Sequence, residues 1–143
     1  MLYAQIDAVY AAIKAIGYTN VEVKVSETGW PSNGDSNEIG ATPQNAKLYN
    51  GNLLRRIEEK QGTPAKPLVP IDVYVFALFN EDLKPGPASE RNYGLYYPNG
   101  SPVYNIGLQG FVFQFSCMYS HKLDFYLGAF KIMIRTREYS SEA

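Results

Sequence analysis

The sequence predicts an α/β fold with a parallel sheet, and three observations support this class. An apolar stripe of helical spacing opens the chain, and a valine-rich run follows it. A second helical stripe then precedes a longer apolar run. Helices that alternate with strands are typical of a parallel sheet covered by helices. A length of 143 residues and a hydrophobic content of 45% fit a globular protein with a core of its own.

The N-terminal segment is predicted to form a helix. Its apolar residues recur at spacings of four, three, four and three, which places them on one helical face. These residues are Leu2, Ile6, Val9, Ile13 and Ile16. Gly17 then ends the helix, because glycine commonly follows the last helical turn. We expect the stripe to face the core.

The next predicted element is a strand over residues 21–25. Its letters, VEVKV, alternate apolar and charged side chains and are rich in valine. The strand leads into Ser26 and Glu27. Residues 30–41 then form a predicted surface loop, because turn-forming residues are dense there. They are Pro31, Asn33, Gly34, Asp35, Asn37 and Gly40. Glu27 is therefore expected where a strand gives way to a loop.

A second helix and a second strand follow this loop. Thr42 and Pro43 suit an N-cap and a first helical position, and the helix should end before Gly62. Its apolar stripe consists of Ala46, Tyr49, Leu53 and Ile57. The segment 71–79, IDVYVFALF, is continuously apolar after its aspartate, which predicts a strand covered on both faces. This strand ends at Asn80 and Glu81.

Two glutamates thus follow predicted parallel strands. Reactive side chains in α/β folds collect at the carboxyl ends of the strands, where Glu27 and Glu81 are expected. Paired carboxylates beside aromatic residues suggest glycoside hydrolysis, in which a retaining enzyme holds them about 5 to 5.5 Å apart. Glutamates at strand ends are also common without any catalytic role, so the pattern leaves both interpretations open.

The string VSETGWPS, residues 25–32, resembles the signature of glycoside hydrolase family 17. This family contains the plant endo-1,3-β-glucosidases and their licheninase relatives. Further segments resemble the family in the same order, among them GATPQNAKLYNGNLL and VYVFALFNEDLKPGPASERNYGLYY. The resemblance covers about residues 2 to 108. It implies that residues 1–108 are the C-terminal part of a (β/α)8 TIM barrel, with about the last two strands and the helices before them.

The resemblance also implies roles for individual residues. Glu27 matches the family's nucleophile in retaining hydrolysis of O-glycosyl bonds in 1,3-β-glucans, and Trp30 matches a substrate-binding aromatic residue. Glu81, Lys84 and Glu90 match a supporting charged cluster, so Glu81 is not expected to be the proton donor. The family's donor lies far upstream of the nucleophile and is expected to be absent from this chain. The alternative is a non-catalytic carbohydrate-contacting or unstable fragment from a truncated gene model.

Composition excludes several other classes of function. A net charge of −1 without long charged runs argues against nucleic-acid binding. A single cysteine, Cys117, and a single histidine, His121, argue against a metal site, and we expect no cofactor. No apolar run is long enough for a membrane span, and no signal peptide is expected. The expected partner is a β-1,3-glucan, without an obligate protein partner. Members of the family are typically secreted to the cell wall or apoplast, but because no signal peptide is expected, the sequence leaves the location of this chain open.

Residues 109–143 are unlike the family and are expected to form a separate, structurally unassigned aromatic tail. The tail contains both Cys117 and His121, to which we assign no role. Relatives often continue into a cysteine-rich carbohydrate-binding module, which one cysteine cannot form. We interpret the tail as sequence that was never selected within the family fold.

Overall fold

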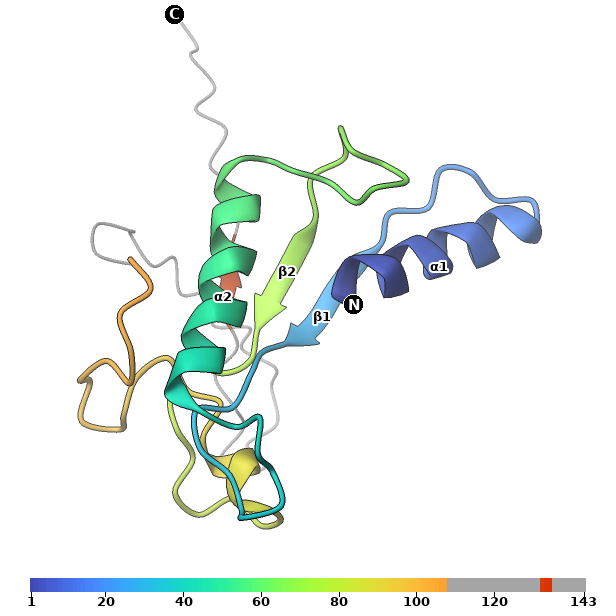
Figure 1. The fold of residues 1–143 in the computed structure, drawn as a ribbon. Helices are drawn as coiled ribbons and strands as arrows, with labels where there is room; N and C mark the ends of the chain where they lie inside the picture. The colour runs from blue at the N-terminus through green and yellow to red at the C-terminus, as the bar shows by residue number, and fades with distance from the viewer. Residues whose placement is uncertain (108–131, 135–143) are drawn as a thin grey trace, which may run out of the picture.

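The structure is a computed structural model that describes residues 1–107 and 132–134. Figure 1 shows its helices and strands. The elements are α1 (Leu2–Ala15), β1 (Lys24–Thr28), α2 (Pro43–Glu58), β2 (Asp72–Val75), the short 3-10 helix η1 (Ala88–Arg91) and β3 (Ile132–Ile134). Apart from β3, the tail lies outside the described residues, so its expected separateness stays a prediction.

The three strands form one sheet in the order β1, β2, β3. β1 and β2 are parallel, with Lys24 opposite Asp72 and Val25 opposite Val73. Because α2 connects two parallel neighbours, the segment from β1 to β2 is a βαβ unit, as the α/β prediction requires. β3 joins the free edge of β2 in antiparallel orientation. The sheet is therefore mixed, which the sequence did not predict.

α2 packs on one face of the sheet and supplies half of the central cluster of buried side chains (Figure 1). The helix begins as predicted: the Thr42 hydroxyl accepts a hydrogen bond from the Asn45 backbone N–H at 3.2 Å, and Pro43 follows the cap. The central cluster of buried side chains comes from α2, β2 and the chain that follows β2. It consists of Leu53, Leu54, Ile57, Val73, Val75 and Leu95.

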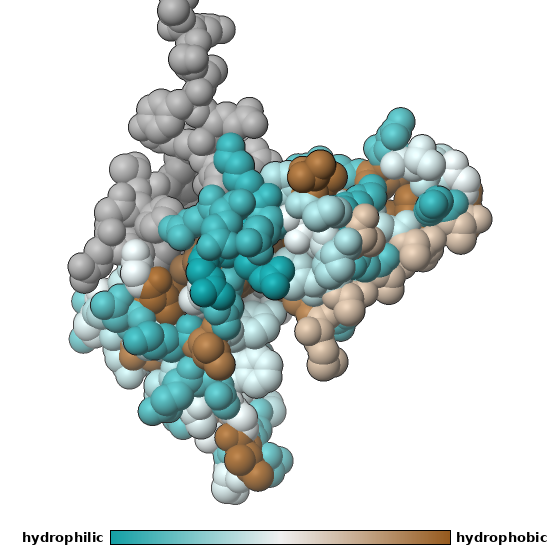
Figure 2. All heavy atoms as spheres, turned by 45° about the horizontal axis from the view of Figure 1, so that its top comes forward, coloured by the Kyte–Doolittle hydropathy of each residue, from teal (hydrophilic) through white to brown (hydrophobic). Residues whose placement is uncertain are grey.

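α1 forms where the sequence predicts it, but its apolar stripe is only partly buried. Ile6 is 4% exposed, whereas Val9 and Ile16 are 46% and 73% exposed. The expectation that the whole stripe faces the core is therefore wrong. The reason is geometric, since α1 begins beside β1 and runs away from the sheet (Figure 1). Figure 2 shows apolar surface over this end of the molecule.

Both strands differ from their predicted bounds. β1 starts three residues later than predicted and includes Glu27 as its penultimate residue. β2 ends at Val75 instead of continuing to Phe79. It is also buried on one face only, because α2 covers Val73 and Val75 while Asp72 and Tyr74 are partly exposed.

β2 is short because the chain changes its hydrogen-bond partner after Val75. The Phe76 N–H still donates to the Thr28 carbonyl at the end of β1, at 2.8 Å. From Ala77 onward the backbone pairs instead with residues 93–96, beginning with the bond from the Ala77 N–H to the Tyr93 carbonyl at 3.1 Å. The peptide bond between Phe76 and Ala77 is cis. The apolar run thus continues past the strand without staying in the sheet.

The pairing of β1 with β2 contains an irregularity at Glu27. Val25 lies opposite Val73 and Thr28 opposite Val75, so β1 takes three steps where β2 takes two. Such a bulge changes the alternation of side chains along a strand. Val25 packs against the core on the α2 side, and Thr28 contacts α2 as well. Ser26 and Glu27, which lie between them, are both exposed, as expected for side chains on the opposite face.

The end of β1 approaches the backbone of β2 so closely that only glycine fits at residue 29. A Cβ atom on Gly29 would overlap the carbonyl oxygen of Phe76, which is backbone and cannot rotate away. The glycine at the centre of TGW in the signature is therefore required for steric reasons. Gly29 lets the two strand ends meet at van der Waals distance.

Gly29→Ala should lower the free energy of unfolding by about 2 kcal/mol or more, because the added methyl group forces the strand ends apart. Urea unfolding followed by circular dichroism measures this loss. Gly51→Ala is the matched control: Gly51 lies within α2, where the nearest heavy atom to an added Cβ is 4.0 Å away. It should raise stability by about 0.5 to 1 kcal/mol. Equal effects of the two substitutions would contradict the steric account.

Candidate active site

The predicted site residues lie in the chain segments that leave the carboxyl ends of β1 and β2. Glu27 is the penultimate residue of β1, and its side chain is exposed. Trp30 follows in the loop after β1 and is 37% exposed. Glu81, Lys84 and Glu90 all lie between β2 and residue 92. Because the two strands are parallel neighbours, both segments leave the same edge of the sheet.

The structure brings the three predicted charged residues together. The Lys84 ammonium lies 2.9 Å from Glu90 and 3.6 Å from Glu81. The three side chains are partly buried, with exposed fractions of 29% for Lys84, 19% for Glu81 and 40% for Glu90. Burial lowers the pKa of Lys84, but the hydrogen bond to Glu90 and the charges of Glu90 and Glu81 outweigh it, so this pKa lies above its ordinary value.

This charged cluster is connected to the strand that carries Glu27. The Lys84 ammonium lies 4.5 Å from the centre of the Phe76 ring, a cation–π contact. The Phe76 backbone in turn donates its hydrogen bond to Thr28, the residue after Glu27. These two contacts link the cluster to the end of β1, and Glu81 within it pairs with Lys84.

Trp30 is held by two contacts that the sequence did not predict. Its indole N–H donates to the Gly40 carbonyl at 2.8 Å. Its ring lies 5.5 Å from that of Tyr49, at an angle of 37°. The Tyr49 hydroxyl is 2.6 Å from the Thr28 hydroxyl. Tyr49 was predicted only as part of the apolar stripe of α2, and nothing in its helical spacing distinguishes this polar role.

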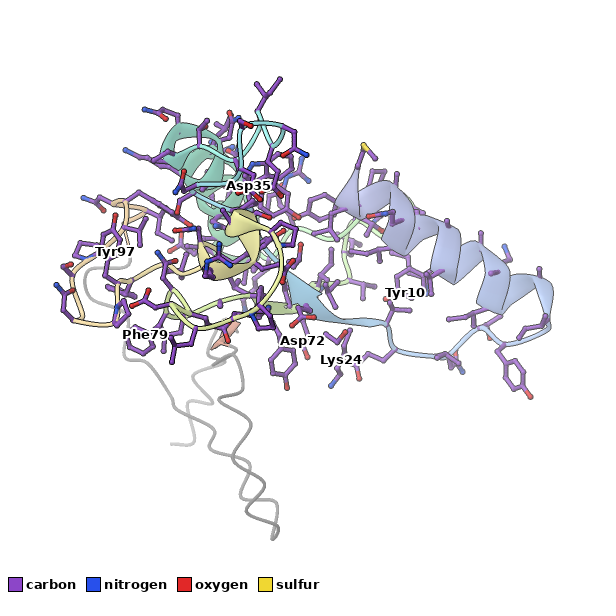
Figure 3. All side chains as sticks on the ribbon, turned by 90° about the horizontal axis from the view of Figure 1, so that it is seen from below. Tyr10, Lys24, Asp35, Asp72, Phe79 and Tyr97 are labelled. Atoms are coloured by element: carbon purple, nitrogen blue, oxygen red, sulfur yellow. The ribbon has the colours of Figure 1, made fainter. Side chains whose placement is uncertain are left out.

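The loops that follow β1 and β2 are tied to each other by hydrogen bonds. Figure 3 shows Asp35 where the first loop meets η1. The Asp35 carboxylate accepts from the Ala88 N–H at 3.0 Å, and the Glu38 carboxylate accepts from the Ser89 hydroxyl and, at 3.3 Å, from the Ser89 N–H. Ser32 donates its backbone and side-chain hydrogens to the Asn92 carbonyl. These ties make one continuous wall out of two loops.

Sequence analysis did not identify Glu38 as a site residue, because it lies in residues 30–41, where the turn-forming residues indicate only a surface loop. The hydrogen bond from the Ser89 hydroxyl, and next the bond from the Asp35 backbone, hold the pKa of Glu38 below its ordinary value. Its role is to receive donors from both loops. No pattern within residues 30–41 could have indicated a partner 51 residues away.

Tyr93 is a second residue that sequence analysis missed. Its ring packs 5.3 Å from that of Phe76, the ring that Lys84 also contacts. Burial raises the pKa of Tyr93, and the charges of Glu90 and Glu38 raise it further, while Lys84 opposes them. The phenol therefore stays neutral near these carboxylates, where it can donate a hydrogen bond.

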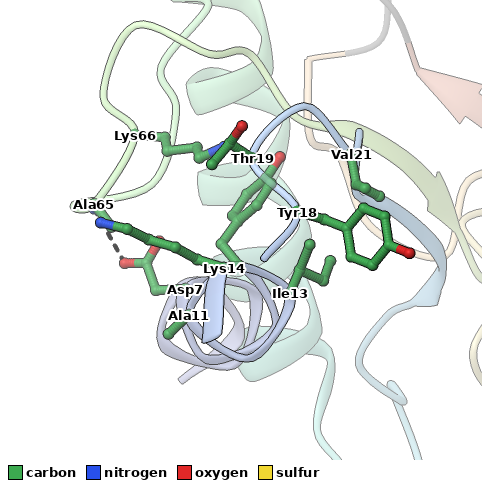
Figure 4. Close-up of a pocket in the computed structure, with 10 residues that line it drawn as sticks. Asp7, Ala11, Ile13, Lys14, Tyr18, Thr19, Val21, Ala65 and Lys66 are labelled. Carbon is green, nitrogen blue, oxygen red and sulfur yellow. Dashed lines mark hydrogen bonds between the residues drawn. The ribbon is translucent and has the colours of Figure 1, made fainter. Parts of the chain in front are cut away.

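A hollow of about 450 Å³ lies elsewhere, between α1, the segment before β1 and the loop before β2 (Figure 4). The Asp7 carboxylate accepts a hydrogen bond from the Ala65 N–H at 3.2 Å, and the Lys66 ammonium lies 4.0 Å from the centre of the Tyr10 ring. These segments precede the strands, so the hollow belongs to the amino-end side of the sheet. It is not part of the site built around Glu27.

In the part of the chain that the structure describes, no three or more histidine, cysteine, aspartate or glutamate side chains are grouped so that they could hold a metal ion. None of its helices is both long and apolar enough to cross a membrane.

A parallel βαβ unit with carboxylates and aromatic side chains at the strand ends is an arrangement found in carbohydrate-cleaving enzymes, and comparison with known proteins identifies the family. The model of glycosyl hydrolases family 17 matches residues 1–108. The chain belongs to this family, whose members named below are glycosidases.

Two curated relatives come from Arabidopsis thaliana. Glucan endo-1,3-beta-glucosidase 14 is 70% identical over 112 residues, which cover 78% of this chain and 29% of the relative. Glucan endo-1,3-beta-glucosidase 11 is 59% identical over 109 residues, or 75% of this chain and 26% of the relative. The chain thus spans less than a third of the length of these relatives.

Solved structures support the same assignment. A β-1,3-glucanase and allergen of Cryptomeria japonica pollen superposes with a TM-score of 0.67 at 41% identity, over 72% of this chain and 31% of the other. One of two plant β-glucan endohydrolases with distinct substrate specificities gives a TM-score of 0.65, also at 41% identity, over 73% of this chain and 32% of the other. The fold is therefore part of the fold of plant β-glucanases.

The stability of the wall formed by the two loops should depend on pH, because Glu38 accepts hydrogen bonds from both loops. Because the pKa of Glu38 is lower in the folded chain than its ordinary value of 4.5, its stabilising effect is present above pH 4.5 and is lost as the pH falls through the folded-state pKa. At pH values below 4.5, the urea midpoint of the wild-type chain should therefore decrease more steeply with falling pH than that of Glu38→Gln. Glu58→Gln, at an exposed position on α2, is the control and should follow the wild type. Parallel curves for all three proteins would refute the role of Glu38.

Proposed function

We propose that this chain carries the nucleophile half of a retaining 1,3-β-glucan hydrolase site, within the C-terminal part of a (β/α)8 barrel. The observation that carries the proposal is the position of Glu27: it lies at the carboxyl end of a parallel strand, on the exposed face of the sheet, beside an ion-paired cluster. The relatives are named glucan endo-1,3-beta-glucosidases, and these names supply the proposed substrate class.

In the proposed reaction Glu27 attacks the anomeric carbon of a glucosyl unit. A covalent glycosyl-enzyme ester forms as the bond to the leaving oxygen breaks, and a general acid gives that oxygen a proton. Water then attacks the same carbon and gives one proton to the deprotonated general acid, while the ester bond breaks and the carboxylate of Glu27 is restored. We place the general acid outside residues 1–108, in the upstream part that the longer relatives possess.

Lys84 is proposed to set the charge of this site. Its ammonium lies 2.9 Å from Glu90 and 3.6 Å from Glu81, so it offsets part of the negative charge of the two carboxylates. One lysine between two carboxylates leaves a net negative cluster beside Glu27. Such a field favours the positive charge that develops on the sugar ring in an oxocarbenium-like transition state.

Trp30 is proposed as a platform for a glucosyl ring. Its indole is partly exposed, and its two contacts with Gly40 and Tyr49 fix its orientation. An apolar ring face held in place loses little freedom when a sugar stacks on it. The substrate would then extend along the wall formed by the two tied loops.

An activated substrate tests the role of Glu27 without requiring the general acid. 2,4-Dinitrophenyl β-laminaribioside releases a phenolate that needs no proton, so the wild-type chain should liberate it. Glu27→Gln should reduce the release by roughly 10³-fold or more. Glu22→Gln, 67% exposed just before β1, should have no effect. Azide added to Glu27→Ala should restore release and yield an α-glycosyl azide. No release from the wild-type chain, or undiminished release from Glu27→Gln, would sink the proposal.

The only tryptophan of the chain provides a separate measurement of binding. Laminarihexaose added to Glu27→Gln, which cannot turn it over, should change the fluorescence of Trp30, and cellohexaose should do so more weakly. In calorimetry, Trp30→Ala should weaken laminarihexaose binding by roughly 10-fold. Binding without any dinitrophenolate release would instead support the alternative, a carbohydrate-contacting fragment that cleaves nothing.

A further inference from the structure

Tyr49 connects α2 to both sides of the proposed nucleophile. Its hydroxyl is 2.6 Å from that of Thr28, the residue after Glu27, and its ring lies 5.5 Å from the ring of Trp30. The helix itself is fixed to the core by Ala46 and Leu53, which are 0% and 4% exposed on the same helical face as Tyr49. Tyr49 is therefore a rigid support that reaches the end of β1.

The bulge in β1 explains why such a support is needed. An extra residue interrupts the regular pairing with β2 between Val25 and Thr28, and Glu27 lies within this interval. Regular ladder hydrogen bonds hold a strand residue in place, and a bulge disrupts them locally. How Thr28 is held then contributes to the orientation of Glu27, because adjacent residues share a peptide plane.

Thr28 is held from two directions. Its carbonyl accepts the hydrogen bond from Phe76 at 2.8 Å, and its hydroxyl shares one with Tyr49. The first contact fixes the backbone after Glu27 relative to β2. The second fixes the side chain relative to α2. Together they fix the side chain of Thr28 and the peptide unit that follows it, and so the position of the Thr28 Cα next to Glu27.

We propose that Tyr49 is a positioning residue that aims Glu27 through Thr28 and steadies Trp30 beside it. This inference rests on the proposed function, because it concerns the attack by Glu27. Tyr49 touches no reacting atom and lies on the helix side of the sheet. Its effect is on the alignment of the carboxylate with the anomeric carbon, where a displacement of about 1 Å can cost on the order of 10²-fold in rate.

A double-mutant cycle in the full 143-residue chain tests the proposal. The variants are Tyr49→Phe, Thr28→Val and the two combined, and Thr28→Ser is the conservative control that keeps the hydroxyl. The measured quantity is the first-turnover rate of dinitrophenolate release from 2,4-dinitrophenyl β-laminaribioside, as a function of substrate concentration. Circular dichroism and the urea midpoint report whether each variant folds as the wild type does.

Tyr49→Phe and Thr28→Val should each slow the first turnover by roughly 10-fold with little change in the half-saturating concentration, and the double variant should be no slower than either. Thr28→Ser should stay close to wild type. Additive losses, or a loss that appears only in the half-saturating concentration and the urea midpoint, would assign Tyr49 a merely structural role. Wild-type release that Glu27→Gln abolishes and Tyr49→Phe leaves unchanged would overturn this inference alone. A wild-type chain that releases nothing would overturn the proposed function and this inference together.

Discussion

The approach of the β1 end to the β2 end is the constraint on which the rest of the site depends. Gly29 allows it, since any side chain there would overlap the Phe76 carbonyl, and the hydrogen bond from Phe76 to Thr28 fixes its distance. At the same point the chain after β2 leaves the sheet and pairs with residues 93–96. Glu27 on one strand and the charged cluster after the other are thereby brought to one edge.

The electrostatics of this edge follow from that close contact. The Phe76 ring makes a cation–π contact with Lys84, and Lys84 forms ion pairs with both Glu81 and Glu90. Although burial lowers the pKa of Lys84, the two carboxylates beside its ammonium favour the charged form and hold this pKa above its ordinary value. The ties between the two loops, through Glu38 and Asp35, add a second set of charge-assisted hydrogen bonds at the rim. The wall and the charged cluster are thus parts of one polar framework supported by the same strand pair.

Local signals in the sequence predicted the elements well wherever they depend on neighbours in the chain. Thr42 caps α2, Gly17 follows α1, and the turn residues of 30–41 form a loop, because capping and turn geometry act over a few residues. The strand bounds were wrong because they depend on partners. Apolar residues 76–79 resemble a strand, yet their hydrogen bonds go to residues 93–96, which no periodicity reveals. The exposed stripe on α1 was missed for the same reason, since burial depends on what packs against a helix.

By itself, the sequence determined the α/β class and, through its signature, the family, because residue type and short spacing encode both. The site residues Glu27, Trp30, Glu81, Lys84 and Glu90 stay predictions that rest on the family resemblance. Only the tertiary structure decided that Lys84 pairs with Glu81 and Glu90, that β1 carries a bulge at Glu27, and that Tyr49 holds Thr28. These contacts join residues that lie on different elements or at different positions of the loop after β2. They arise from the packing of α2 and two parallel strands, and their partners become neighbours only when the chain has folded.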